Sequence, residues 1–202
     1  MKFKSKQLTT AIILFLFTIK GMDAQVIYSK TGHINVVSEN KIKKVEADNY
    51  QVYSTVDLST GDVKFEGLLK SFEFKLGAAD RVFSSEKVNI KQYPKIRFEG
   101  KIPPVELDLN NFSEVTVEVD GMLYIWDEKR RTKAQVQITS VGDGKQVFAY
   151  SSFLMQIEEG SMKKLNEIMA EKLPEVLNIN TSTLGISRDI IVNLDATYKL
   201  KQ

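Results

Sequence analysis

The sequence of 202 residues contains no cysteine and a single histidine. Without cysteine the chain forms no disulfide, offers no thiolate to a metal ion and has no cysteine nucleophile. Because His33 is the only histidine, sites built from several histidines are excluded. His33 is also the one histidine that could act as a general base, but we expect it to have a structural or surface role. No Gly-x-Ser-x-Gly segment presents a serine nucleophile, and no glycine-rich loop is suited to phosphate. These absences predict no catalytic residues and no metal site, and they favour a protein that is not an enzyme.

The only long apolar run lies near the amino terminus. Residues 11–19 are largely apolar, but the run is shorter than the roughly 20 residues that a membrane-spanning helix needs. Three lysines precede it within the first six residues, and the small residue Ala24 follows it. This order is typical of a secretory signal, so we expect residues 1–24 to be a cleaved signal peptide. The protein would then act in the periplasm or outside the cell, and the cut offers no cysteine for a lipid anchor.

Cleavage would change the charge balance of the chain. The whole sequence has 28 basic and 26 acidic residues, of which the leader holds four lysines and one aspartate, so 24 basic and 25 acidic residues would remain. A net charge near zero gives no support for nucleic-acid binding. No internal repeat, low-complexity tract or proline-rich linker divides the remainder, which is long enough to bury a substantial core. We therefore expect one domain at residues 25–202.

Apolar and polar residues alternate along most of this domain, which predicts β-strands with one buried face. The alternation is clearest at 115–125. It recurs at 52–58, 63–65, 96–102, 134–138 and 189–200, while 147–157 is apolar on both faces. Turn residues at 59–62, 127–131 and 141–144 separate these segments at hairpin length, and Gly67 suggests a bulge or bend.

One helix interrupts the strands. Apolar residues at 161–173 share one helical face, Ser161 is a candidate N-terminal cap, and Pro174 would end the helix. We expect this helix to cover the sheet, although a lid or an interfacial segment is also compatible with its apolar stripe. The pattern predicts a mainly β protein: an antiparallel, lipocalin-like β-barrel of about eight strands with one or two short helices.

Four segments follow one another along the chain: a strand at 32–38, a hairpin with an aromatic pair at 58–74, Tyr-Pro-Lys-Ile-Arg-Phe-Glu-Gly at 93–100, and a Gly-x-Leu-x-Ile strand at 119–125. In this order they resemble motifs of the YceI-like family of exported lipid-binding proteins. The family's hallmark has the form Tyr-Pro-x-x-x-Phe-x-(Ser/Gly), which residues 93–100 match.

The sequence departs from the family at two places. The family usually follows the Gly-x-Leu-x-Ile strand with a His-Gly-(Val/Ile)-Thr-(Lys/Arg) turn, whereas 126–129 reads Trp-Asp-Glu-Lys. The stretch between the aromatic pair and the Tyr-Pro segment also lacks the family's acidic, asparagine-rich composition. These departures bear on the mouth of the barrel and on the usual ligand.

The resemblance implies an elongated apolar cavity that holds a polyisoprenoid chain, such as the tail of an isoprenoid quinone or a related lipid. A barrel of about eight strands can enclose one small ligand, and each methylene removed from water contributes about 0.8 kcal/mol. On this interpretation the partner is an apolar lipid, and no other cofactor is required. The residues that would line the cavity share the inward parity: Phe72, Phe74, Phe98, Val117, Val119, Leu123, Ile125, Val136, Ile138, Phe148 and Tyr150.

The residues leave other interpretations open. The same side chains could fill one another's space, which would give a solid barrel that acts as an adaptor for another exported protein. A reaction chamber for a hydrolase or isomerase would need polar groups inside the barrel, with His33 as the best candidate base. Trp126 either packs in the core or covers the barrel mouth. The sequence leaves open the ligand, the pathway, the oligomeric state and any transient contact with a membrane.

Overall fold

The computed structural model of the chain describes residues 26–39, 43–85, 92–103, 113–142, 145–173 and 180–199. The predicted leader at 1–24 and the predicted helix end at Pro174 lie outside the described residues. The strands are β1 (Val26–Glu39), β2 (Lys44–Asp57), β3 (Asp62–Leu68), β4 (Glu73–Phe74), β5 (Lys95–Lys101), β6 (Glu114–Ile125), β7 (Glu128–Val141), β8 (Gln146–Gln156) and β9 (Asp189–Lys199). The helices are η1 (Leu69–Ser71), α2 (Gly77–Phe83), α3 (Glu159–Lys172) and α4 (Thr181–Leu184).

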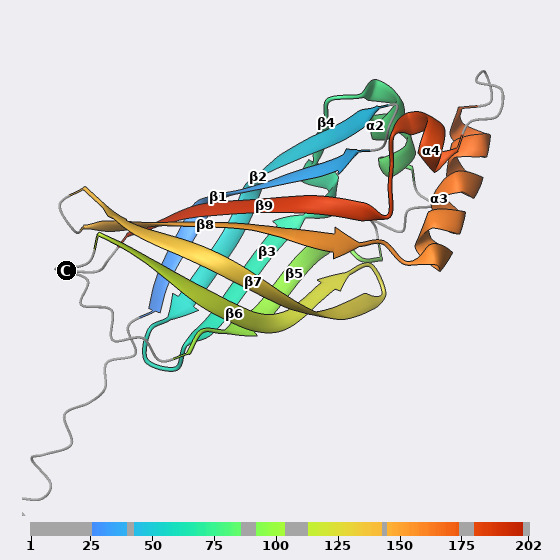
Figure 1. Cartoon of the computed structure of the whole chain (residues 1–202). Helices are drawn as coiled ribbons and strands as arrows, with labels where there is room; N and C mark the ends of the chain where they lie inside the picture. Colours follow the sequence, from blue (N-terminus) through green and yellow to red (C-terminus); the bar gives the residue numbers. More distant parts are fainter. Residues whose placement is uncertain are drawn as a thin grey trace, which may run out of the picture.

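The long strands form one closed antiparallel barrel (Figure 1). Their order is β1, β9, β8, β7, β6, β5, β3 and β2, and pairing of β1 with β2 closes the ring. The two-residue strand β4 adds to the edge of β2. The predicted fold class, a mainly β antiparallel barrel of eight long strands with short helices, is confirmed.

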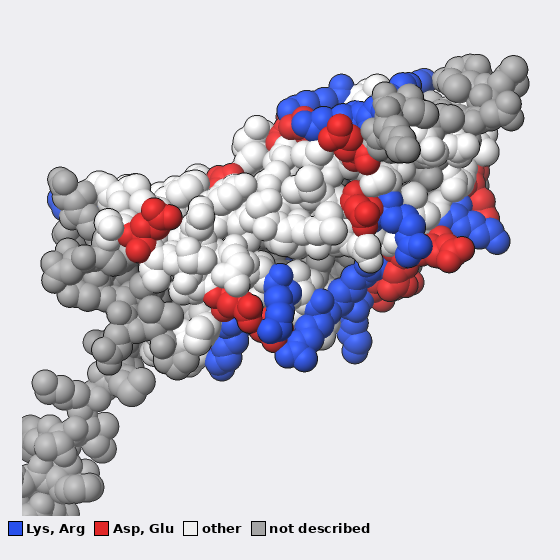
Figure 2. Space-filling model, viewed as in Figure 1, with Lys and Arg blue, Asp and Glu red and all other residues white. Residues whose placement is uncertain are grey.

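The alternation in the sequence corresponds to the two faces of the barrel wall. In β6, Val117, Val119 and Leu123 are buried, whereas the neighbouring residues Thr116 and Glu118 are exposed. Because successive side chains of a strand point to opposite faces, this burial places one parity of each strand inside the barrel. On the side shown in Figure 2, charged side chains gather along the β6–β7 edge and at the helical end, with a broad uncharged surface between them.

The two ends of the barrel are closed differently. At one end, the interior is filled by the strands' own side chains, with Ile102, Val117, Ile138 and Val147 in one cluster. The opposite end is covered by the helices, which lie together there (Figure 1). Their apolar residues pack against barrel residues in a separate cluster that includes Val82, Met169 and Ile186.

Helix α3 confirms the predicted apolar face but not its predicted start. Leu165, Ile168 and Met169 are buried on one face, as the spacing predicts. The helix begins at Glu159, two residues before the predicted start. Its N-cap residue is Glu158, which makes no side-chain capping bond. Ser161 is not the cap, because its hydroxyl donates a hydrogen bond to the Glu128 carboxylate of the barrel instead.

One prediction about chain reversals is wrong: the turn predicted at 127–131 is shorter, because β7 begins at Glu128, directly opposite Ile125. Of the bulge or bend suggested at Gly67, the bulge is absent, because β3 pairs with β5 in unbroken register. The chain does leave the strand after Leu68, where the 3-10 helix η1 begins. A side chain at Gly67 would lie 3.1 Å from Ile34, so this glycine makes room for the core. The register shifts occur in β1, between residues 29 and 34.

The periodicity did not reveal helix α2, and it did not indicate that β1 begins as early as Val26. Helix α2 has only seven residues, too few for a helical period to emerge, yet it buries Ala79 and Val82 at the helical end. Within the described ranges, no helix has the length and apolarity needed to cross a bilayer.

Candidate functional site

Two adjoining apolar cavities occupy the barrel interior. The capped cavity, of about 120 Å³, lies at the helical end and is bordered by Phe72, Phe74, Phe83, Ile125, Trp126 and Arg130, among others. The central cavity, of about 100 Å³, lies further along the barrel and is bordered by Phe65, Phe98, Val119, Leu123, Phe153 and Leu194, among others. Ile96, Met155 and Val192 border both cavities. Each volume is several times the roughly 10–15 Å³ that one water requires.

Most of the residues predicted to line a cavity lie beside one of these two. Phe72, Phe74 and Ile125 border the capped cavity. Phe98, Val119, Leu123 and Val136 border the central cavity, and so does Tyr150, although its side chain lies on the outer face. Val117 and Ile138 also face the interior, but they pack into the filled end. Contact of any of these residues with a ligand stays a prediction.

The parity assigned to β8 is wrong. Val147 and Ser151 of this strand are buried, so the side chains of Phe148 and Tyr150 lie on the outer face. Tyr150 is 36% exposed, and its hydroxyl donates a hydrogen bond to Asn193 Oδ1 at 3.4 Å. The strand is apolar on both faces, so its sequence carries no parity signal. The residues that it contributes to the central cavity include Ala149, Phe153 and Met155.

Phe98 stands between the central cavity and the filled end, since it packs against the clusters on both sides. Its ring lies against two glycines that face each other across β5 and β6, Gly100 and Gly121. A Cβ atom at either glycine would lie 2.5 Å from the ring. These glycines therefore create the space in which Phe98 forms the floor of the cavity.

Three hydroxyls beside the central cavity are bonded to one another or to the backbone. The Ser54 hydroxyl donates to Lys64 O at 3.0 Å and lies 2.6 Å from the Tyr198 hydroxyl, which must be the donor because Ser54 has one proton. Burial raises the pKa of Tyr198, which keeps it neutral. The Ser151 hydroxyl donates to Gln135 O at 2.8 Å. These hydroxyls stabilise the barrel wall and are not poised as nucleophiles.

The capped cavity has a different polar inventory. Glu128 and Arg130 lie on the inward parity of β7, and Arg130 Nη2 is 2.7 Å from Glu128 Oε2 and 3.2 Å from Glu158 Oε1. Arg130 Nε and Trp126 Nε1 are both buried, and neither has a hydrogen-bond partner in the part of the chain that the structure describes. We expected residues 127–131 to be a solvated turn, so sequence reasoning missed Glu128 and Arg130. Glu128 and Arg130 have even numbers, as do the apolar residues Ala134 and Val136 of the same strand, and this shared parity could have indicated that they face the interior.

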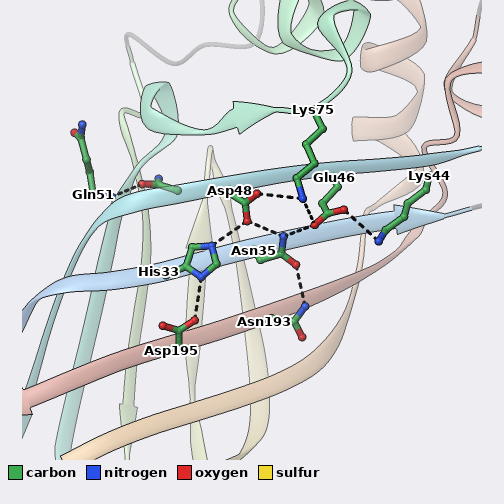
Figure 3. Close-up of polar contacts among 10 residues, drawn as sticks. His33, Asn35, Lys44, Glu46, Asp48, Gln51, Lys75, Asn193 and Asp195 are labelled. Atoms are coloured by element: carbon green, nitrogen blue, oxygen red, sulfur yellow. Dashed lines mark hydrogen bonds and ion pairs between the residues drawn. The ribbon is translucent and has the colours of Figure 1, made fainter.

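A second polar cluster lies on the outer face of the barrel (Figure 3). His33 of β1 contacts Asp48 of β2 through Nε2 and Asp195 of β9 through Nδ1, each at 2.9 Å. The ring of Tyr50 stacks on the imidazole with centroids 4.5 Å apart. Gly32 and Ile34 on either side of His33 face the interior, so the histidine faces away from both cavities.

This cluster continues along the same face. Asn35 donates to Asp48 Oδ1 at 2.8 Å and to Glu46 Oε1 at 3.1 Å, and Lys75 lies 2.6 Å from Glu46 (Figure 3). Hydrogen bonds from Lys75 and Lys44 lower the pKa of Glu46 to about 2. Among the described residues, no group of three histidine or carboxylate side chains is placed to hold a metal ion. The cluster therefore joins β1, β2 and β9 at the seam that closes the barrel.

Fold and cavity together define a lipocalin-like antiparallel barrel that is filled at one end, covered by helices at the other and hollow between them. Comparison with family models and with curated proteins gives no match. Solved structures do match. One is a polyisoprenoid binding domain from Saccharophagus degradans, with a TM-score of 0.68 at 12% identity over 88% of this chain and 99% of that one.

Two further solved structures are similar. BcnA from Burkholderia cenocepacia gives a TM-score of 0.57 at 13% identity, covering 82% of this chain and 95% of its own. A YceI protein from Campylobacter jejuni gives a TM-score of 0.48 at 15% identity, covering 80% and 84%. At such identities the likeness concerns the fold. The chain therefore shares the fold of the Saccharophagus degradans and Burkholderia cenocepacia structures.

Proposed function

We propose that the protein binds and carries a long apolar lipid of isoprenoid type inside its barrel, in the periplasm or outside the cell after removal of residues 1–24. The observation that carries this proposal is the pair of adjoining apolar cavities between the helical cover and Phe98. The Saccharophagus degradans structure with the same fold is described as a polyisoprenoid binding domain, which supports the same ligand class here.

The shape and chemistry of the interior favour a linear hydrocarbon. The two cavities succeed one another along the barrel and share Ile96, Met155 and Val192. Most of the residues that border them are apolar, so binding would be driven by removal of apolar surface from water at about 0.8 kcal/mol per methylene. A long isoprenoid tail can therefore be held with few polar contacts.

The two alternative functions are less well supported. A reaction chamber needs an acid, base or nucleophile inside the barrel, but His33 lies on the outer face and is already bonded to two carboxylates. The hydroxyls of Ser54, Tyr198 and Ser151 are paired as well. A solid adaptor barrel would have no interior cavity. We therefore propose binding without turnover.

The proposal is tested by filling the central cavity with an apolar side chain. Ala149 borders this cavity, so Ala149→Phe should reduce the affinity for geranylgeraniol at least tenfold by occupying its space. Ser152 is exposed on the same strand, so Ser152→Phe is the matched control and should bind as the unmodified protein does. Calorimetric titration measures the affinity, and circular dichroism checks that both variants fold.

The unmodified protein should also carry lipid when isolated from its own host. Native mass spectrometry of the exported protein is expected to show a bound isoprenoid on a chain that begins near Gln25. Absence of any bound lipid, together with no binding of geranylgeraniol in titration, would overturn the carrier function. A chain in its host that retains residues 1–24 would overturn the proposed location but not the binding.

A further inference from the structure

Two residues that border the capped cavity carry N–H donors without a partner among the described residues, and most of the other bordering residues are apolar. Trp126 Nε1 and Arg130 Nε are buried, and neither has a hydrogen-bond partner among the described residues. Both residues border the same cavity, beneath the helical cover. No described residue beside the central cavity has such an unpaired buried donor.

Unpaired buried donors are costly and rare. Leaving one buried donor without an acceptor costs about 1–3 kcal/mol, and nine in ten or more of such groups in folded proteins have a partner. Two unpaired donors beside one cavity indicate that an acceptor enters from outside the chain. A ligand that occupies the cavity can supply that acceptor.

Trp126, which borders the capped cavity, also has an unusual backbone conformation. Trp126 has φ +53°, the left-handed region, and it occupies a two-residue hairpin turn between Ile125 and Glu128. Such turns strongly favour glycine or asparagine at their positive-φ positions, because a bulky side chain there costs of order 1–3 kcal/mol. The turn nevertheless carries the only tryptophan of the chain and places it at the cavity.

The charges around Arg130 indicate what kind of acceptor fits. Its Nη2 is paired with Glu128 at 2.7 Å and with Glu158 at 3.2 Å, so two carboxylates already balance the guanidinium charge. Ser161 donates to Glu128 and holds that carboxylate in place. An anionic group entering here would meet two negative charges and one positive charge. The site therefore suits a neutral acceptor better than a phosphate or a carboxylate.

We propose that the capped cavity is a head-group site in which Trp126 Nε1 and Arg130 Nε donate hydrogen bonds to a neutral oxygen, such as a quinone, ketone or ester carbonyl or a hydroxyl. The tail of the same lipid lies in the central cavity. This inference rests on the proposed carrier function and deepens it, because it distinguishes neutral isoprenoid lipids from isoprenoid diphosphates. Trp126, one of the two donors, lies where the chain departs from the family's usual turn.

The first experiment compares ligands on the unmodified protein. The probes are menaquinone-4, which has quinone oxygens, geranylgeranyl diphosphate, which is anionic, and squalene, which has no head group. Menaquinone-4 should bind more tightly than the diphosphate and should quench the fluorescence of Trp126, whereas squalene should bind with little quenching. Tighter binding of the diphosphate would overturn the proposal while leaving the carrier function intact.

The second experiment removes each donor separately. Trp126→Phe keeps an aromatic ring but has no N–H, and Arg130→Lys keeps the charge opposite Glu128 but has no Nε. Each should weaken menaquinone-4 about three- to tenfold, the contribution of one hydrogen bond, and leave squalene unchanged. Tyr124→Phe in the same hairpin is the control, because Tyr124 lies on the outer face beside Arg97.

The outcomes separate the two proposals. Equal affinity of both donor variants and the unmodified protein for menaquinone-4 would overturn the head-group site, while retained squalene binding would uphold the carrier. Failure of the unmodified protein to bind menaquinone-4 and squalene would overturn the carrier function itself. Equal losses for squalene and menaquinone-4 in both variants would show a packing role for these side chains and would also overturn the head-group site.

Discussion

His33 shows how one residue can be conspicuous in a sequence for a reason unrelated to catalysis. As the only histidine it is the obvious candidate base, yet both of its ring nitrogens are bonded to carboxylates on neighbouring strands. Burial lowers the pKa of His33, but the hydrogen bonds and charges of Asp48 and Asp195 outweigh it, so the pKa lies above its usual 6.5. The charged imidazole therefore stabilises the seam between β1, β2 and β9.

The raised pKa of His33 predicts how stability depends on pH. A group that binds its proton more tightly when folded stabilises the fold fully below its unfolded pKa, about 6.5, and this contribution is lost as pH rises through the folded pKa. The midpoint of urea unfolding should therefore fall as pH rises above about 6.5. His33→Gln should remove the decrease in that window. A pH profile that is the same in both proteins would contradict the role assigned to His33.

Other residues were not predictable from the sequence, for physical reasons that differ. Phe148 was assigned to the interior because β8 is apolar on both faces, and only its pairing with β7 and β9 fixes the parity. Glu128 and Arg130 belong to residue types that usually favour solvent, yet they lie at the cavity because they pair with each other. We expected Trp126 either to pack in the core or to cover the mouth of the barrel. It lies beneath the helices and borders the capped cavity.

At the scale of elements, regular period and length determined what the sequence revealed. The alternation of β6 spans twelve residues and predicted its faces correctly. The apolar stripe of α3 recurs over several turns and predicted a helix, although it did not fix the first residue. Helix α2 spans two turns and gave no signal. The sequence therefore predicted only part of the helical cover of the barrel.

The packing of α3 predicts that it contributes strongly to stability. Met169 is fully buried between the helix and the barrel, so Met169→Ala should destabilise the protein by about 2–5 kcal/mol through lost packing and the void it leaves. Glu167→Ala on the exposed face of the same helix should change stability by less than about 0.5 kcal/mol. Urea unfolding measures both. Equal effects of the two substitutions would show that α3 does not pack as described.

At the scale of the whole molecule, the residue pattern predicted the barrel, whereas only the family resemblance implied its hollow interior. Strand number and antiparallel pairing follow from period and turn spacing, and the resemblance to the YceI-like family pointed to the same fold. A cavity depends instead on where side chains fall short of meeting, as at Ile96 and Met155, and where they meet, as at Val117 and Ile138. Whether side chains meet or leave a cavity is decided only when residues from several strands come together in the closed barrel.

The floor at Phe98 predicts an upper limit to the length of lipid that contributes to binding. Each methylene buried should raise affinity by about fourfold, and the gain should stop once the tail reaches the ring of Phe98. Titration with geraniol, farnesol, geranylgeraniol and solanesol, isoprenoid alcohols of increasing length, should therefore show affinity that rises and then levels off.

Removing the floor should move this limit. Phe98→Ala opens the way toward the filled end between Gly100 and Gly121, so affinity should continue to rise at lengths where the unmodified protein shows no further gain. The substitution should also reduce stability by about 3–5 kcal/mol, so calorimetry must be run well below the unfolding transition. Phe148→Ala on the outer face is the control and should leave the limit unchanged. If Phe98→Ala and Phe148→Ala gave the same limit as the unmodified protein, the tail would not extend toward the filled end.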